Sequence, residues 1–265
     1  MVEHDPTVRP VTDGEVAEFW ENGWVMLRNL ISREVAAELL DGARRRLDPE
    51  PEGFAFLGQR EKPPFFEMDL RPSDEEPVFR VVAHSSELGR NTARLLGRNS
   101  SVRLMYDAVT VKRPTTDGGG PTPLHQDGSV LPFDRTSLTY WIALDDVTPE
   151  MGSMRFRQGS HKHGLFGRRQ HESEAEFERE WPRSKGYPLS EPITYQPGDA
   201  TAHQSLTVHH APANATDRPR WACMIVQFPA DALYTTSHHL TNHLELELFE
   251  PFDRPDFPIV YVAER

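Results

Sequence analysis

The sequence predicts a mainly β protein in which helices flank a barrel or sandwich. Residues 100–230 hold many short runs of β-branched and aromatic residues separated by glycine and proline turns, a pattern typical of barrels and sandwiches. The helical patterns lie mainly before that region, and no internal repeat or interdomain linker is visible. Because β barrels of 265 residues are often single domains, we expect one domain over residues 1–265. Its β core should span about 100–230, after a helical region at 11–47.

The N-terminal part predicts two helices with a short strand between them. Thr12 and Glu15 have the spacing of a capping box, in which each side chain binds the backbone N–H of the other residue. Gly23 should end this first helix, and residues 24–28 are typical of a short strand. Ser32 should then cap a second helix, which closes with three arginines where cations complement the helix dipole.

The following segments alternate between irregular and regular patterns. Residues 48–77 lack periodicity, residues 78–96 are helical in pattern, and residues 102–112 have the β-branched alternation of a strand. Four phenylalanines in the irregular segment are expected in core or loop packing, with substrate contact as the alternative: Phe54, Phe56, Phe65 and Phe66. Further strands are expected at 138–144, 151–156, 192–195, 202–214 and 221–228. A charged, helix-like stretch within 163–190 is expected to form a lid or a surface insertion.

Composition and charge exclude several classes of protein. The net charge of −12 opposes binding to nucleic acid or to anionic membranes, and no apolar run is long enough to span a bilayer. The N-terminus lacks the pattern of a signal peptide, and the single cysteine, Cys223, rules out an internal disulfide. We therefore expect a cytoplasmic protein whose partner is a small-molecule substrate. Its oligomeric state is open between monomer and homodimer.

A short histidine and aspartate motif is the strongest chemical signal. His125 and Asp127 lie two residues apart, so in an extended segment both side chains point to the same face. Downstream, His203 and His209 share one face of a second expected strand by the same period of two. Two imidazoles and one carboxylate on one side of an iron ion leave its other positions open for substrate and O₂. Arg220 follows on the next strand, and if buried it needs an anion such as a dicarboxylate cosubstrate.

The order and spacing of these motifs resemble the phytanoyl-CoA dioxygenase family over roughly residues 11–230. The resemblance is carried by His125-Gln-Asp127, Trp141-Ile-Ala-Leu-Asp-Asp146, Gly152, Gly159-Ser-His161, His209 through Asn214, and Asp217-Arg-Pro-Arg220. It implies a non-haem Fe(II) oxygenase that uses 2-oxoglutarate and O₂ as cosubstrates. The implied fold is a double-stranded β-helix, a jelly roll or cupin-like barrel with flanking N-terminal helices.

The resemblance also assigns roles to individual residues. His125, Asp127 and His209 match the metal ligands, and no catalytic residue beyond them is expected. Arg220 matches the arginine that pairs with the distal carboxylate of 2-oxoglutarate. The same match gives secondary assignments: Trp141 to the cosubstrate pocket or plain barrel core, His203 to a supporting or core position, and His210 to a non-ligand. Thr139 shares the strand face of Trp141, so we expect it to hydrogen-bond the same carboxylate. Lys112 lacks the Lys-Pro pair of relatives, which leaves its role open.

The implied reaction is hydroxylation, or another oxidation of an unactivated C–H bond. Relatives that halogenate replace the ligand carboxylate with a small residue, whereas this chain keeps Asp127, which favours hydroxylation. Desaturation, epoxidation and cyclisation stay open. The substrate is expected to be a small, largely apolar metabolite of secondary metabolism, and its contacts are unknown. Two alternatives are a cupin-type isomerase or hydrolase without redox chemistry, and a degenerate barrel that serves as a binding module.

Overall fold

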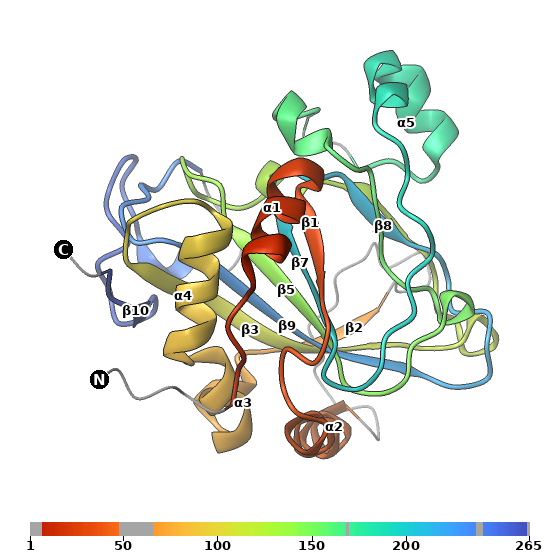
Figure 1. The fold of residues 1–265 in the computed structure, drawn as a ribbon, viewed down its shortest axis with the longest axis horizontal. Helices are drawn as coiled ribbons and strands as arrows, with labels where there is room; N and C mark the ends of the chain where they lie inside the picture. The colour runs from red at the N-terminus through yellow and green to blue at the C-terminus, as the bar shows by residue number, and fades with distance from the viewer. Residues whose placement is uncertain (1–6, 48–65, 168–169, 237–240, 264–265) are drawn as a thin grey trace.

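The core consists of two antiparallel β sheets, seen in the computed structural model, which describes residues 7–47, 66–167, 170–236 and 241–263 (Figure 1). The larger sheet has the order β1-β7-β5-β9-β3-β10, with β2 also paired to β3, and the smaller has the order β4-β8-β6. The larger sheet comprises β1 Trp24–Leu27, β2 Glu67–Leu70, β3 Val102–Lys112, β5 Leu138–Ala143, β7 Ala200–Gln204, β9 Arg220–Pro229 and β10 Ile259–Tyr261. The smaller comprises β4 Thr122–His125, β6 Arg155–Phe156 and β8 His209–Ala211. This is the expected jelly-roll architecture.

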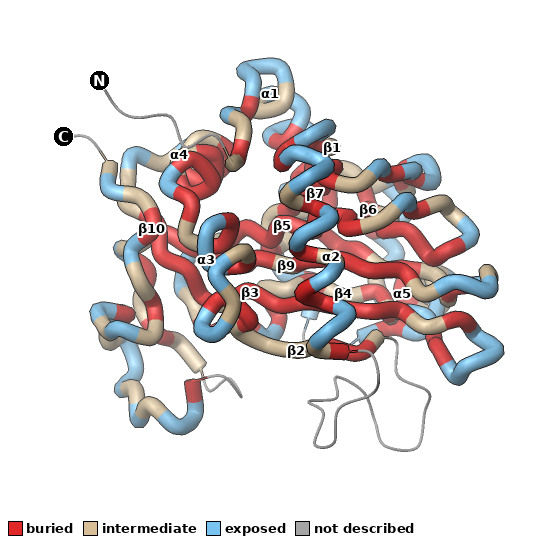
Figure 2. The backbone as a smooth tube through the Cα atoms, turned by 90° about the horizontal axis from the view of Figure 1, so that it is seen from below, coloured by how far each residue is buried: buried red, intermediate tan, exposed pale blue. Residues whose placement is uncertain are grey.

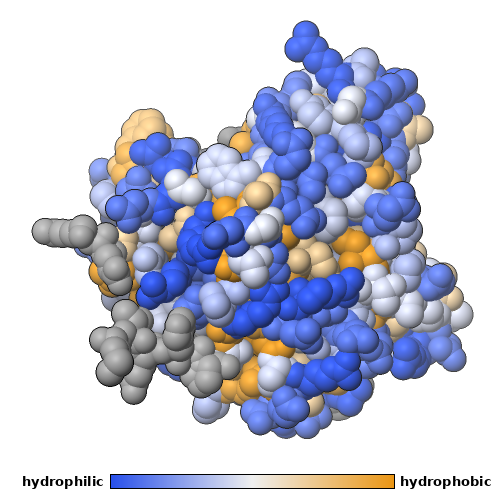
Figure 3. All heavy atoms as spheres, in the orientation of Figure 1, coloured by the Kyte–Doolittle hydropathy of each residue, from blue (hydrophilic) through white to orange (hydrophobic). Residues whose placement is uncertain are grey.

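Helices cover the outer face of the larger sheet (Figure 1). They are α1 Asp13–Asn22, α2 Arg33–Leu47, α3 Pro77–Ala83 and α4 Ser86–Leu95, whereas α5 Glu174–Glu180 lies away from the larger sheet and packs beside the smaller one. Figure 2 shows the central strands buried and the outward sides of the helices exposed. The face seen in Figure 3 is largely hydrophilic, with apolar residues in separate patches. Within the described ranges, every helix is too short or too polar to cross a membrane.

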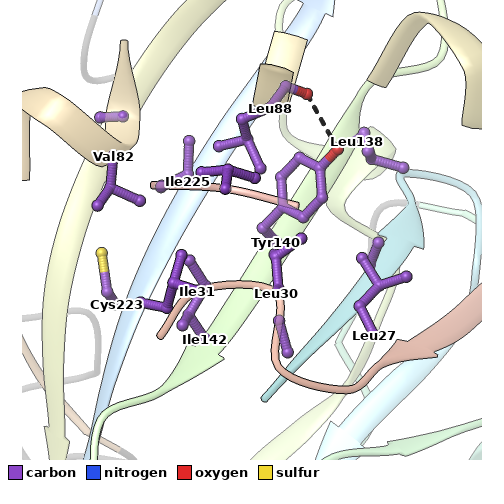
Figure 4. Packing of buried hydrophobic residues seen from close by; sticks show 14 of the residues in the cluster. Leu27, Leu30, Ile31, Val82, Leu88, Leu138, Tyr140, Ile142, Cys223 and Ile225 are labelled. Atoms are coloured by element: carbon purple, nitrogen blue, oxygen red, sulfur yellow. Dashed lines mark hydrogen bonds between the residues drawn. The ribbon is translucent and has the colours of Figure 1, made fainter. Parts of the chain in front are cut away.

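Strand alternation divides the molecule into a packed side and a functional side. Leu138, Tyr140 and Ile142 of β5 enter the main apolar cluster under the helices, where the Tyr140 hydroxyl donates to the Leu88 carbonyl at 3.3 Å (Figure 4). The residues between them point the opposite way, and Thr139 there lines a cavity together with His125 and His209 of the smaller sheet. One strand therefore supplies both core packing and cavity wall.

The N-terminal predictions are confirmed. The Thr12 hydroxyl accepts from the Glu15 N–H at 3.2 Å, and the Glu15 carboxylate accepts from the Thr12 N–H at 2.8 Å. Gly23 ends α1 with φ 79°, a left-handed conformation that glycine adopts without strain. Ser32 caps α2 through the Val35 N–H, and β3 spans the predicted residues.

Other boundaries were wrong. The helix predicted over 78–96 is two helices, because Ser85 leaves the helical path and caps α4 through the Leu88 N–H. The strand predicted over 151–156 is reduced to β6, since a 3-10 turn occupies Pro149–Met151. Residues 192–195 make one isolated β bridge instead of a strand. Strand β2 was missed inside the irregular segment, where Phe54, Phe56 and Phe65 lie outside the described residues.

A surface insertion at 163–190 carries α5. Its anchor is Arg157, a 3% exposed side chain that pairs with Glu174 at 3.1 Å and with Glu178 at 2.6 Å. Arg157 also donates to the backbone carbonyls of Ser184 and Tyr187. The insertion is therefore fastened to the smaller sheet through a buried guanidinium, and its role as a lid stays a prediction.

Candidate metal centre

Three side chains converge on one point at the inner face of the smaller sheet. His125 ends β4, His209 begins β8, and these two residues pair directly across the two strands. The possible ligand atoms of His125, Asp127 and His209 all lie within 4.8 Å of one another. Each histidine Nε2 is 3.6 Å from the Asp127 Oδ1. Two imidazoles and one carboxylate oxygen therefore surround a space suited to a metal ion.

Asp127 lies outside the strand on which it was expected. It opens a 3-10 turn at Asp127–Ser129, after β4 has ended. The alternation argument still holds locally, because Gln126 is extended with φ −121° and ψ 131°. His125 and Asp127 therefore emerge on the same side of the backbone.

Both histidine ligands have a fixed tautomer. The Nδ1 of His125 is 2.8 Å from the Pro123 carbonyl, and the Nδ1 of His209 is 3.0 Å from the Thr207 carbonyl. A carbonyl oxygen only accepts hydrogen bonds, so each Nδ1 carries the proton. Each Nε2 then presents its lone pair to the shared space, as a metal ligand requires.

The carboxylate of Asp127 is held by its second oxygen. Oδ2 accepts from the Thr139 hydroxyl at 2.7 Å and lies 3.2 Å from the His203 Nε2. Oδ1 is left to face the two histidine ligands. The hydroxyl of Thr139 has one proton, and it goes to Asp127 and not to a cosubstrate carboxylate as the sequence had suggested. Thr139 and His203 thus hold the Asp127 carboxylate through the oxygen that does not face the two histidine ligands.

The electrostatics favour a divalent cation. Burial opposes ionisation of Asp127, but the surrounding imidazoles, His209 foremost and then His125 and His203, hold its pKa well below the usual value. Burial lowers the pKa of His209, and the neighbouring histidines lower it further. A carboxylate with neutral imidazoles, and no thiolate, is a donor set that divalent first-row metals such as iron accept.

The second histidine segment is organised differently from the prediction. Residues 202–214 do not form one strand, because β7 ends at Gln204 and a turn closed by the Thr207 N–H to the Gln204 carbonyl precedes β8. His203 therefore belongs to the larger sheet and His209 to the smaller. Their rings nevertheless lie 4.3 Å apart, because the two sheets face each other across the site.

A cavity of about 230 Å³ extends from the ligands to Arg220. Arg220 begins β9 in the larger sheet, so it faces His209 across the barrel instead of lying on an adjacent strand. Its guanidinium is 5.0 Å from the ring centroid of Trp141 and donates to the Gly152 carbonyl. Trp141 thus lines the cavity, and its part in binding a cosubstrate stays a prediction.

Arg220 has an unsatisfied charge. Its side chain is 3% exposed, its Nε has no hydrogen-bond partner, and no described residue places a carboxylate within ion-pairing distance. Burial lowers the pKa of Arg220 to about 10, an effect that Tyr195 partly offsets. A buried cation without an anion is costly, so this end of the cavity fits an anionic group supplied by a ligand.

Two other residues have clear structural roles. The Lys112 ammonium is fully buried and donates to the Gly120 and Pro212 carbonyls and to the Thr122 hydroxyl at 2.9–3.2 Å. It joins β3 to the segments around β4 and β8. His210 points away from the ligands toward Glu174, 3.6 Å away, and burial beside arginines lowers its pKa to about 4. Its position agrees with the prediction of a non-ligand.

Two residues at the site were not predicted from any pattern in the sequence. Tyr106 lines the cavity from β3, and Gln126 binds segments distant in the sequence. Phe66 and Gln170 also line the cavity, at the edges of the stretches with least pattern. Irregular segments have no periodicity from which the direction of a side chain can be inferred.

The fold and the three candidate ligands correspond to one class of protein, the metalloproteins that hold an ion with two histidines and one carboxylate inside a double-stranded β-helix. Residues 19–222 match the family described as phytanoyl-CoA dioxygenase (PhyH), and the chain belongs to that family. It is 35% identical over 117 residues to methylphosphonate hydroxylase of Gimesia maris, covering 44% of this chain and 42% of the relative. It is 31% identical over 152 residues to phytanoyl-CoA dioxygenase domain-containing protein 1 of Danio rerio, covering 55% and 50%. These matches thus span about half of the curated relatives or less.

Solved structures match over nearly the whole chain. SnoK, a non-haem α-ketoglutarate-dependent carbocyclase from nogalamycin biosynthesis, superposes with a TM-score of 0.80 at 27% identity, covering 96% of this chain and 98% of SnoK. SnoN, an epimerase of the same biosynthesis, gives 0.76 at 25% identity, covering 94% and 98%. Another SnoN structure contains Fe³⁺, α-ketoglutarate and nogalamycin RO, with a TM-score of 0.78. The architecture is therefore that of non-haem 2-oxoglutarate-dependent enzymes.

Proposed function

We propose that the protein is an Fe(II)- and 2-oxoglutarate-dependent oxygenase that oxidises an unactivated C–H bond of a small, largely apolar metabolite. One observation carries the proposal. The three-ligand site and the unpaired, buried Arg220 share a single cavity, so a metal ion and a dicarboxylate can be bound together.

Each of the three ligands would contribute one donor atom to the metal. His125 and His209 would donate through Nε2, and Asp127 through Oδ1, while the remaining coordination positions stay open to the cavity. Bound iron with 2-oxoglutarate and O₂ supplies the oxidising power, by coupling decarboxylation to succinate and CO₂ with oxidation of the substrate. Thr139 and His203 keep Asp127 turned so that one oxygen faces the metal.

Arg220 would bind the distal carboxylate of 2-oxoglutarate. Its planar guanidinium matches a carboxylate in a paired, charge-assisted geometry. Trp141 packs against the guanidinium and fixes its orientation. Because Arg220 is already buried, the carboxylate would offset the cost of an unpaired cation. The pair would also place the reacting end of the cosubstrate over the metal ligands.

The rest of the cavity suits an apolar substrate. Away from Arg220 and the ligands, the wall is largely apolar and aromatic, formed by Phe66, Met68, Tyr106, Val130 and Leu131. The likeness to SnoK and SnoN, which come from nogalamycin biosynthesis, supports a secondary metabolite as the substrate. We therefore favour a natural-product scaffold over a highly charged substrate.

Ring closure or epimerisation is a second candidate outcome. It is favoured by the match to a carbocyclase and an epimerase over at least 94% of this chain. Both outcomes begin with removal of a hydrogen atom from a C–H bond, so the ligand set serves either. Epimerisation then returns a hydrogen atom to the same carbon, which needs an added reductant. A cupin-type isomerase or hydrolase would have no use for a buried, unpaired Arg220, and it is the weaker alternative.

Substrate-stimulated succinate release tests the proposal. Iron-loaded protein with 2-oxoglutarate and O₂ should release succinate faster when the correct scaffold from a panel of apolar polycyclic natural products is added. The product mass separates the outcomes: a gain of one oxygen atom indicates hydroxylation, a loss of two hydrogen atoms indicates ring closure, and an unchanged mass indicates epimerisation. Release of a product that requires neither O₂ nor 2-oxoglutarate would overturn the proposal in favour of non-redox chemistry.

Thr139→Val is expected to weaken metal binding without unfolding the protein. Valine keeps the shape of threonine but removes the hydrogen bond to the Asp127 Oδ2, so the carboxylate loses one of its two supports. Loss of such a supporting contact costs about 10- to 100-fold in metal affinity. Anaerobic Fe(II) titration measures it. The matched control is Thr92→Val, a buried threonine of α4 whose hydroxyl bonds Gln227, and equal effects of the two substitutions would refute the role of Thr139.

A further inference from the structure

Gln126 stands between two metal ligands but does not face the metal. The extended backbone that turns His125 and Asp127 to one side turns Gln126 to the other. Its side chain is only 3% exposed, so its amide must find partners inside the protein.

Both polar atoms of that amide are hydrogen-bonded. Nε2 donates to the Gly164 carbonyl at 2.8 Å and to the Leu206 carbonyl at 2.6 Å, and Oε1 accepts from the Phe166 N–H at 2.7 Å. Gly164 and Phe166 begin the insertion that carries α5. Leu206 lies in the turn between His203 and His209. The Gln126 side chain thus joins three segments: the His125–Asp127 segment, the insertion and the turn that precedes His209.

The insertion packs against the reverse side of the ligand strands. Leu124 and Val208 form an apolar cluster with Phe166 and Phe177 of the insertion. Leu124 immediately precedes His125, and Val208 immediately precedes His209, so residues alternating with the ligands form the base of this cluster. The backbone of Leu124 also exchanges hydrogen bonds with that of His171 at 2.8 and 3.0 Å.

We propose that Gln126 is a positioning residue that couples the metal site to the insertion at 163–190. Its amide fixes the spacing of His125, Asp127 and His209 by tying their backbones to the folded insertion. Because coupling between two sites is reciprocal, metal binding stabilises the insertion as much as the insertion supports the metal. The inference rests on the metal site of the proposed function, but it requires neither iron nor 2-oxoglutarate.

The chemistry of an amide explains the choice of glutamine. The three partners are two carbonyls and one N–H, which need two donors and one acceptor on the same side chain. A glutamate would place a carboxylate against two carbonyl oxygens, and an apolar side chain would leave all three backbone groups without a partner.

The test measures binding of Co(II) alone to the full chain carrying Gln126→Met. Methionine preserves length and volume but not the hydrogen bonds. We expect the Kd for Co(II) to rise about 10-fold or more. In the wild type, Co(II) should slow hydrogen exchange of the amides in residues 170–187, and the variant should lose this response. The matched control is Gln227→Met, a fully buried glutamine bonded to Thr92 on the far side of the larger sheet.

The outcomes are distinct. A folded Gln126→Met variant whose Co(II) affinity falls no more than that of Gln227→Met would overturn the proposal. So would wild-type exchange in residues 170–187 that Co(II) leaves unchanged, a result that would exclude the coupling even if the variant does not fold. Wild-type protein that shows the coupling with Co(II), yet forms no succinate with iron, would support this inference while overturning the oxygenase proposal.

Discussion

Arg220→Ala is expected to raise the 2-oxoglutarate concentration needed for half-maximal activity by roughly 100-fold or more. The guanidinium has no carboxylate partner among the described residues, so the cosubstrate would be the anion that satisfies it. Loss of one partner of a buried, charge-assisted pair costs about 2–5 kcal/mol, and each 1.4 kcal/mol is tenfold in affinity. Initial rates against 2-oxoglutarate concentration, and direct titration of the cosubstrate, measure the change.

Fe(II) affinity should be unaffected by Arg220→Ala, because Arg220 contacts none of the three ligands. Arg218→Ala is the matched control, since it removes an exposed guanidinium two residues away and should leave cosubstrate affinity near wild type. If the Arg220→Ala enzyme kept wild-type affinity for 2-oxoglutarate, Arg220 would not be the residue that binds the cosubstrate.

Asp127→Ala is expected to abolish turnover and to weaken Fe(II) binding by at least about 100-fold, more than loss of a supporting residue does. The substitution removes the one anionic ligand and leaves the Thr139 hydroxyl and the His203 Nε2 without their acceptor. Anaerobic Fe(II) titration and succinate formation are the measurements.

Asp117→Ala removes an exposed carboxylate ten residues before Asp127 and serves as the control, with wild-type metal binding expected. If Asp127→Ala kept both its iron and its turnover, the metal would have to be held elsewhere. That result would refute the assignment of the three ligands.

Part of the site could be predicted from the sequence because the geometry of neighbouring residues determines which way their side chains point. An extended backbone at Gln126 is enough to place His125 and Asp127 on one side. Local rules also predicted α1 and β3, since a capping box and a β-branched alternation act within a few residues. The family resemblance then supplied His209 and Arg220, which no local rule could have joined to His125.

What the sequence could not supply depends on contacts between distant segments. The turn between His203 and His209 breaks a period of two that looked continuous, because the chain passes there from one sheet to the other. Strand alternation places Thr139 on the cavity face of its strand, but it cannot show which group the hydroxyl contacts. That group is the Asp127 carboxylate and not the cosubstrate. The hydrogen bonds of Gln126 reach residues 38 and 80 positions away in the sequence, beyond the range of any local pattern.

One cavity of the protein is proposed to bind Fe(II) and 2-oxoglutarate together. Anaerobic addition of both to the purified protein tests it most directly, because chelation of the iron by the cosubstrate produces a weak visible charge-transfer band. We expect the band to appear only when both are present, and to disappear with formation of succinate when O₂ is admitted. Normal iron loading with no band and no succinate would contradict the claim.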